Sequence, residues 1–263
     1  MKTPPAGTLE ADPQVSQTPV SSTATATDPA CQDIAGRIIS DQVESALLEK
    51  PLPFQVYLPP CYGQQADLRY PVLYLLHGLH SDQTQWEQLG LALSADKLIQ
   101  SGESLPFLVI MPKIPDVSTY PSQLNEQVYA EELLPYVDAH YQSRAERDFR
   151  AIGGLSRGAT WALRIGLSQW QLFGKIGLHS VAIEYDEVKS WVRTLSAMNA
   201  EDIPGLFLDV GDQDEDRLSA QSLDQALSQA EIPHSYHLYT GSHNEAYWSE
   251  HLPSYLEWYT RGW

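Results

Sequence analysis

The chain is patterned as short apolar segments separated by segments in which apolar residues recur at helical spacing. The apolar segments predict buried strands at residues 70–76, 107–112, 175–180 and 206–210. The periodic segments predict helices at residues 88–100, 126–141, 217–230 and 247–259. Strands without a polar face are typical of a parallel sheet that is covered on both sides. The alternation therefore predicts an α/β fold, with a mainly parallel sheet and helices on both faces.

The remaining segments complete this expectation. Residues 37–45 and 54–60 predict two strands of a hairpin-like opening, the second ended by prolines and a glycine. Residues 235–239 predict the last strand, whereas residues 181–203 are expected to be irregular and partly helical. With 263 residues, of which 43% are hydrophobic, the chain is long enough for one large domain, which we place at residues 31–263.

Residues 1–30 differ in composition from the rest. They are rich in Thr, Pro, Ser and Ala and hold almost no large apolar side chain, which predicts a disordered tether. Such stalks are common behind an export signal or a lipid anchor, although an interdomain linker has the same composition. Cys31 and Cys61, the only cysteines, form either a disulfide or two free thiols; the tether favours export, and with it the disulfide. We therefore expect a secreted or surface-tethered protein, with a cytoplasmic location as the alternative.

The composition is strongly acidic, because 16 Lys and Arg stand against 34 Asp and Glu, for a formal net charge of -18. Nucleic acids and anionic membranes repel such a chain, so neither is expected as a partner. No run approaches the roughly 18 apolar residues of a membrane span, so membrane insertion is not expected either. The sequence does not indicate an oligomeric state.

The first chemical motif is Gly154-Leu155-Ser156-Arg157-Gly158, a G-x-S-x-G pattern. Residues 149–155 before it predict a short strand, and residues 159–167 after it predict a helix. A strand, a tight turn and a helix are the context in which such a serine is exposed as a nucleophile. The glycines relieve the crowding that side chains would cause at that turn. Ser156 is therefore the candidate nucleophile.

A serine hydroxyl needs a base, and the loops after two later strands supply candidates. His243 lies in a glycine-containing loop after residues 235–239, and Asp212, Asp214 and Asp216 follow residues 206–210. The order Ser, Asp, His is that of the α/β-hydrolase triad, in which the base takes the serine proton and the acid fixes the base. Spacing alone does not choose among the three aspartates.

A tetrahedral intermediate also needs two donors for its oxyanion. The backbone N–H of Arg157 is one candidate, because it follows the nucleophile, and that of Leu79 is the other, because it follows an early strand. The chain at this point resembles the putative esterase family of α/β-hydrolases, which includes esterase D (S-formylglutathione hydrolase), feruloyl and acetyl xylan esterases, enterochelin esterases and mycolyltransferases. The stretches that carry the resemblance are residues 70–79, 131–137 with Tyr141, 151–158, 211–214, and 241–244 before Trp248 and Leu252.

The resemblance implies an α/β-hydrolase fold, with the acid at Asp214 and an oxyanion donor at Leu79. Members usually have Met after the nucleophile and then a Gly-Gly pair, whereas this chain has Arg157 and then Gly158-Ala159. Because the expected donor is a backbone group, catalysis should tolerate the change. We expect the Arg157 side chain to pack or pair beneath the turn, and Trp161 to belong to the core.

Substrate contacts are expected near the strand ends and in residues 181–203, which we expect to form the acyl pocket. The candidates are His80, Gln85, Trp86, Ser180, Val181, Ile183 and Trp248. No histidines stand at the spacing of a helical metal site, so no metal and no cofactor are expected.

Three functions are consistent with the sequence. The resemblance implies a serine carboxylesterase with an acyl-enzyme intermediate, acting on feruloyl or acetyl esters of plant polysaccharide, and favours hydrolysis over acyl transfer. An S-formylglutathione hydrolase-like thioesterase is an alternative, which the tether and the disulfide disfavour. A catalytically silent binding module on the same fold is another. It requires that His243 not lie within hydrogen-bond reach of Ser156 and an aspartate.

Overall fold

A single sheet of eight strands organises residues 33–263. The computed structural model describes residue 1, residues 33–115 and residues 123–263. The tether predicted at residues 1–30 and Cys31 of the predicted disulfide lie outside the described residues, so both stay predictions. The strands are β1 (Arg37–Ser45), β2 (Lys50–Leu58), β3 (Val72–Leu76), β4 (Leu108–Pro112), β5 (Arg150–Leu155), β6 (Lys175–His179), β7 (Gly205–Gly211) and β8 (Ser235–Tyr239).

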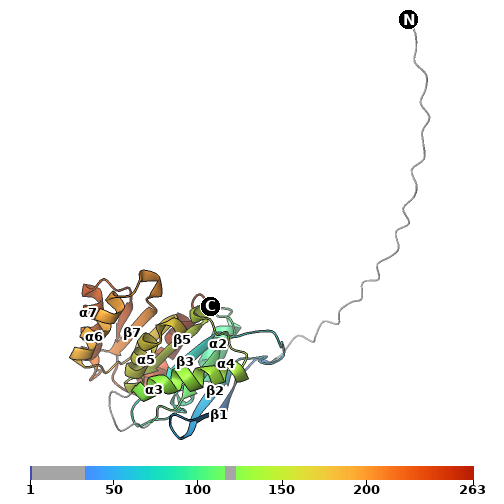
Figure 1. The fold of residues 1–263 in the computed structure, drawn as a ribbon, viewed down its shortest axis with the longest axis horizontal. Coiled ribbons are helices and arrows are strands. Elements are labelled where there is room, and N and C mark those ends of the chain that lie inside the picture. Colours follow the sequence, from blue (N-terminus) through green and yellow to red (C-terminus); the bar gives the residue numbers. More distant parts are fainter. Residues whose placement is uncertain (2–32, 116–122) are drawn as a thin grey trace. The chain divides into compact units, whose positions relative to one another are not determined.

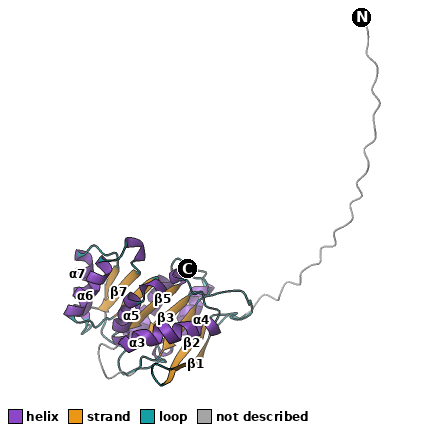
Figure 2. Cartoon of the chain, viewed as in Figure 1, coloured by secondary structure: helices purple, strands orange, loops and turns teal. Residues whose placement is uncertain are grey.

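The order of strands in the sheet is β1-β2-β4-β3-β5-β6-β7-β8. The β1–β2 and β2–β4 pairs are antiparallel, which confirms the hairpin-like opening, and every other neighbouring pair is parallel. Figure 1 shows this sheet between helices, and Figure 2 marks its strands in orange. The predicted α/β architecture is therefore confirmed.

Eight α-helices connect and cover the strands in the described part of the chain. They are α1 (Gln85–Gln88), α2 (Leu91–Gln100), α3 (Gln123–Gln127), α4 (Leu134–His140), α5 (Arg157–Ser168), α6 (Tyr185–Ser196), α7 (Arg217–Gln229) and α8 (Glu245–Thr260). Among the described residues, no helix is both long enough and apolar enough to span a bilayer.

Two predicted helices differ in the structure. The helix predicted at residues 88–100 begins later, at Leu91 of α2, because Gly90 has a φ of 92° and separates α2 from the short helix α1 before it. The helix predicted at residues 126–141 contains a π-helical stretch, Val128–Leu133, between α3 and α4. Pro135 has no N–H to donate to the preceding turn, which is consistent with a wider turn at this place.

Each face of the sheet has its own apolar core, as alternating side chains of β3 show. Tyr74 and Leu76 belong to the core that α3 to α7 cover, whereas Leu73 and Leu75 belong to the core that contains residues of α1, α2 and α8. All four side chains are at most 1% exposed. A strand that is buried on both faces explains why the sequence shows an uninterrupted apolar run there.

The central strands leave room for one large side chain of α8. The hydroxyl of Tyr259 would lie 1.7 Å from a Cβ added at Gly153 of β5 and 1.8 Å from one added at Gly177 of β6. Tyr259 is fully buried, and its hydroxyl lies 3.0 Å from Nε2 of His179. The two glycines thus allow α8 to pack closely against the strand that carries the nucleophile.

We expect Gly153→Ala to lower the free energy of unfolding by about 1–3 kcal/mol, because its methyl group would overlap the Tyr259 ring in a closed core. Urea unfolding followed by circular dichroism measures this difference. Gly205→Ala is the matched control, since an added Cβ at that strand glycine meets its nearest atom at 3.5 Å. Equal stability of the two variants would contradict the packing role of Gly153.

Candidate active site

Ser156 occupies a strained turn between β5 and α5. Its φ of 53° and ψ of -124° lie outside the regions that residues with a side chain ordinarily adopt. The close approach of α5 requires small neighbours, because a Cβ at Gly154 would lie 2.5 Å from the Gly158 carbonyl group. A Cβ at Gly158 would lie 2.3 Å from the carbonyl oxygen of Leu76 on β3. The two glycines of the motif are therefore required sterically, as the sequence predicts.

The hydroxyl of Ser156 meets His243 from the loop between β8 and α8. Ser156 Oγ lies 2.9 Å from Nε2 of His243, and Nδ1 of the same ring lies 2.9 Å from Oδ1 of Asp214. Because the carboxylate accepts the proton of Nδ1, Nε2 is left as an acceptor for the serine hydroxyl. The three residues that the sequence predicts as nucleophile, base and acid thus lie within hydrogen-bond distance of one another. The binding-module alternative required that His243 lie outside this distance, so the geometry does not favour it.

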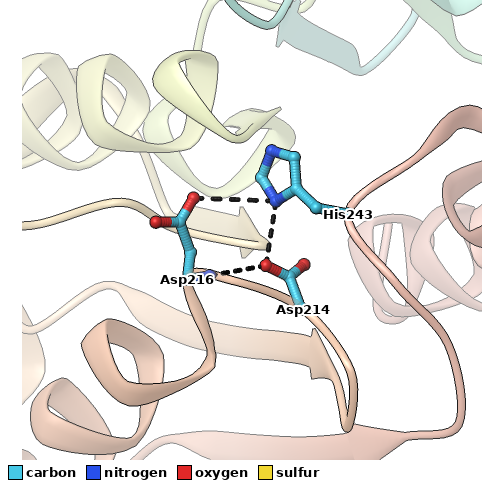
Figure 3. A group of neighbouring side chains, drawn as sticks. All are labelled: Asp214, Asp216 and His243. Carbon is cyan, nitrogen blue, oxygen red and sulfur yellow. Dashed lines mark hydrogen bonds and ion pairs between the residues drawn. The ribbon is translucent and has the colours of Figure 1, made fainter.

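The three candidate aspartates have separate positions. Asp214 is 6% exposed and holds Nδ1 of His243, and its Oδ1 also accepts the Asp216 N–H. Asp216 Oδ2 lies 3.6 Å from the same Nδ1 atom of His243, next to the Asp214 carboxylate, as Figure 3 shows. Asp212 instead accepts the Gly241 N–H at 3.0 Å, which ties the aspartate loop to the histidine loop.

The loop between β8 and α8, which carries His243, is held in place by contacts of α8. The Asn244 side chain caps this helix by accepting the Tyr247 N–H at 3.0 Å. The Tyr247 hydroxyl donates to the buried carboxylate of Asp209 on β7 at 2.6 Å. The Trp248 ring stands edge-on to the His243 ring, with 5.0 Å between the ring centroids. These contacts hold the imidazole at the carboxyl end of the sheet.

Neighbouring carboxylates govern the protonation of the site. Burial lowers the pKa of His243, but the hydrogen bond to Asp214 and the charges of Asp214, Asp216 and Glu215 outweigh it, so the pKa is raised. Burial raises the pKa of Asp214, but its hydrogen bonds with His243 and Ser180 bring the pKa below its ordinary value. Asp214 therefore stays ionised beside an imidazole that readily accepts a proton.

The loop that carries Leu79 is supported by three buried side chains. Gln85 Oε1 accepts the Gly78 N–H at 2.8 Å, and Trp86 Nε1 donates to the Leu76 carbonyl at 3.1 Å. His77 Nε2 accepts the Ile114 N–H at 2.9 Å, which leaves Nδ1 to donate to the Gly78 carbonyl at 2.8 Å. Burial lowers the pKa of His77, consistent with a neutral ring. Gln85 and Trp86, predicted as substrate contacts, are thus supports of the loop.

Ser156 lines one pocket, and a second pocket shares two lining residues with the first. The first, of about 380 Å³, is lined by Leu79, Ser156, Arg157, Thr160, Trp161, Ala182, Glu215, Asp216 and His243. The second, of about 320 Å³, is lined by His77, Leu79, His80, Ser81, Lys113, Ile114 and Arg157. We call them the serine pocket and the lysine pocket. Leu79 and Arg157 line both, so these two residues separate them.

The predicted substrate contacts do not line the serine pocket in the described part of the chain. Ser180 is fully buried and accepts a hydrogen bond from Trp248 Nε1 at 3.0 Å. Val181 and Ile183 are packed in the core, and His80 lines the lysine pocket instead. Of the residues within 181–203 whose side chains the structure describes, only Ala182 lines the serine pocket, so these residues do not form most of the expected acyl pocket.

Residues of α5 take over part of the predicted role. Trp161 is buried, as the sequence predicts, and in addition lines the serine pocket together with Thr160. Both lie one turn after Ser156, so helical spacing was a usable signal for them. The Arg157 side chain, expected beneath the turn, is half-buried and lines both pockets. That expectation was wrong, because the space beneath the turn is closed by the approach of Gly158 to the carbonyl groups of Leu76 and His77.

One group among the described residues has the geometry to hold a metal ion. It comprises Asp214, Asp216 and His243, whose ligand atoms lie within 4.8 Å of one another. A metal there would take the Nδ1 atom that now donates to Asp214. It would therefore compete with the arrangement that orients the imidazole toward Ser156.

Comparison with known proteins gives one family and several relatives. The family model described as "Putative esterase" matches residues 45–259. An endo-1,4-beta-xylanase/feruloyl esterase of Xylanibacter ruminicola is 36% identical over 136 residues, which are 48% of this chain and 19% of the relative. An esterase of Mycobacterium tuberculosis is 28% identical over 158 residues, which are 54% of this chain and 33% of the relative. The chain thus spans a third or less of these curated relatives.

Solved structures share the fold. A ferulic acid esterase is 25% identical, with a TM-score of 0.77 and with 86% of this chain and 98% of the other chain covered. An S-formylglutathione hydrolase of Staphylococcus aureus is 23% identical, with a TM-score of 0.71 and the same coverage. At 23% identity, the similarity to the S-formylglutathione hydrolase indicates a shared fold and nothing about function.

We expect Asp216→Asn to lower the pKa of His243, because a negative charge 3.6 Å from Nδ1 stabilises the imidazolium. The neutral ring would then persist to lower pH than in the parent protein. Titration of the histidine ring resonances by NMR measures the shift. Asp148→Asn, which removes an exposed charge just before β5 at the opposite end of the strands, serves as the control. An unchanged His243 titration in Asp216→Asn would contradict the charge coupling.

Proposed function

The chain belongs to the putative esterase family of α/β-hydrolases, and we propose that it is a serine carboxylesterase that works through an acyl-enzyme intermediate. The observation that carries the proposal is the continuous hydrogen-bonded chain from Ser156 through His243 to Asp214, with 2.9 Å at each step. A serine on a strained turn, facing the acceptor nitrogen of an oriented imidazole, is the arrangement that nucleophilic catalysis requires. These distances favour an enzyme over a silent binding module.

In the acylation step, the Ser156 oxygen attacks the ester carbonyl carbon while Nε2 of His243 takes the hydroxyl proton. The carbonyl oxygen becomes an oxyanion, for which the backbone N–H groups of Leu79 and Arg157 are the proposed donors. His243 then returns the proton to the leaving alcohol as the bond between carbon and alcohol oxygen breaks. Asp214 stays ionised throughout and stabilises the imidazolium.

In the deacylation step, water repeats the attack with the same groups. His243 takes a proton from the water, the hydroxide adds to the acyl carbon, and the proton passes to Ser156 as the carboxylic acid leaves. The supports of the Leu79 loop matter for both steps, because an oxyanion donor must be fixed before charge develops. Gln85 and Trp86 supply that fixation through Gly78 and Leu76.

For the substrate class, we propose feruloyl or acetyl esters of plant polysaccharide. The support is the 36% identity to an endo-1,4-beta-xylanase/feruloyl esterase over about half of this chain. The serine pocket supports it as well, because Trp161 provides an aromatic wall beside Ser156. A location outside the cytoplasm belongs to the same proposal and rests on the composition of residues 1–30. An S-formylglutathione hydrolase-like thioesterase remains the alternative substrate class.

We expect Ser156→Ala to lower kcat for p-nitrophenyl acetate by at least about 1,000-fold, because the nucleophile is absent. An organophosphate should label the parent protein at Ser156, which mass spectrometry of the peptide detects, and should not label the variant. Ser168→Ala, at the other end of α5, is the matched control. Retained hydrolysis in a folded Ser156→Ala protein would refute the serine mechanism.

A substrate panel tests the class. We expect methyl ferulate or acetylated xylan to give a higher kcat/KM than S-formylglutathione, because the pocket is open and has an aromatic wall. Ferulate release is followed by its absorbance, acetate release by a coupled assay, and thioester hydrolysis by loss of thioester absorbance. A clear preference for the glutathione thioester would instead support the alternative class.

A further inference from the structure

The serine pocket and the lysine pocket, which meet at Leu79 and Arg157, carry opposite charge. The serine pocket has the carboxylates of Glu215 and Asp216 on its His243 side. The lysine pocket has Lys113 in its wall and contains no Asp or Glu among its lining residues. Arg157 stands between them and lines both. A substrate that lies over Ser156 therefore meets negative charge on one side and positive charge on the other.

The two cations are not neutralised by neighbours. Among the residues that the structure describes, neither Lys113 nor Arg157 has an ion pair within 4.0 Å. Asp82 interacts electrostatically with Lys113 without an ion pair within 4.0 Å, and its carboxylate already accepts the N–H and the hydroxyl of Thr84 at 2.9 and 2.7 Å. His77 adds no charge, because burial lowers its pKa. The cations are thus available to a ligand.

From this polarity we propose that the lysine pocket binds a carboxylate of the ester substrate, held by Lys113 and Arg157. The inference rests on the proposed esterase function and adds a property to the substrate. A chain with a net charge of -18 repels anions at a distance, so a local pair of unpartnered cations beside the nucleophile has a specific effect. The two cations attract an anionic group of the substrate when its ester group is bound at Ser156.

The inference also explains the departure at position 157. The family resemblance leads one to expect Met after the nucleophile, a side chain that can pack but carries no charge. Arg157 keeps the backbone N–H that an oxyanion donor needs and adds a guanidinium that suits a carboxylate. Lys113 reaches the same pocket from the segment after β4, so the two cations come from different parts of the chain.

The experiment compares charged and uncharged esters of similar length. Mono-p-nitrophenyl glutarate and p-nitrophenyl pentanoate share the leaving group and differ in a terminal carboxylate. The readout is kcat/KM for the glutarate ester divided by kcat/KM for the pentanoate ester. Differences in the intrinsic reactivity of the two esters cancel when this ratio is compared between variants. We expect Lys113→Met to lower this ratio about fivefold or more, and Arg157→Met to lower it likewise, since each retains an apolar stem and removes the charge.

The control is Lys97→Met, which removes the same charge from α2 outside both pockets. We expect its ratio to equal that of the parent protein. Raising the salt concentration should lower the ratio of the parent protein and should lower that of Lys113→Met less, because only Arg157 then remains to attract the carboxylate. Equal ratios in the parent protein, Lys113→Met and Arg157→Met, with this pair of esters and also with the pair that carries the charge on the alcohol, would overturn the inference. Absence of Ser156-dependent hydrolysis of the uncharged ester would instead remove the proposed function on which it rests.

The carboxylate can belong to the acyl part or to the alcohol part, and a second pair of esters distinguishes them. 3-Carboxyphenyl acetate and 3-carbamoylphenyl acetate place the charge on the alcohol. A ratio that depends on Lys113 with the glutarate pair assigns the carboxylate to the acyl part. Dependence only with the phenyl acetate pair assigns it to the alcohol. Dependence with neither pair overturns the inference.

Discussion

The close packing of α5 against β3 and β5 is the constraint on which the site depends. At Gly158 the helix touches the carbonyl groups of Leu76 and His77, and at Gly154 the strand touches the helix in return. This close packing leaves no space for an unstrained turn between β5 and α5. Ser156 is therefore held in a backbone conformation that costs of order 1–3 kcal/mol. The core on both sides of the sheet stabilises the turn against that cost. As a result, the Ser156 hydroxyl projects from the end of the sheet.

A second constraint joins the acid and the base. Asp212 accepts the Gly241 N–H, and the Gln213 N–H donates to the Gly241 carbonyl at 2.8 Å, so the two loops share backbone contacts. Below them, the fully buried Asp209 accepts the hydroxyls of Tyr247 and Tyr255 and lies 2.6 Å from Nδ1 of His179. A buried carboxylate is tolerated only when it is fully bonded. This network fixes the start of α8, and with it the position of His243.

The acidic loop has effects beyond holding the base. Asp214 orients the imidazole, while Asp216 and Glu215 raise its pKa and make one wall of the serine pocket negative. Arg157 lines this pocket as well as the lysine pocket, in which Lys113 adds a second positive charge. The strongly negative composition therefore says little about the charge that a substrate meets at the nucleophile. Local placement of a few side chains decides it, because charges in water are screened over about 8–10 Å.

The sequence by itself determined the sheet, the strained serine and the order of nucleophile, acid and base, because apolar runs and glycine-flanked turns are local patterns. It did not separate Asp212, Asp214 and Asp216 without the family resemblance, since their difference lies in which partner each meets across the sheet end. Only the tertiary structure decided that Gln85 and Trp86 support the Leu79 loop, that Ser180 and Val181 are buried, and that Arg157 lines two pockets. Whether a side chain next to a strand end faces ligand or core depends on the helices that pack over it, and those contacts join residues far apart in the chain.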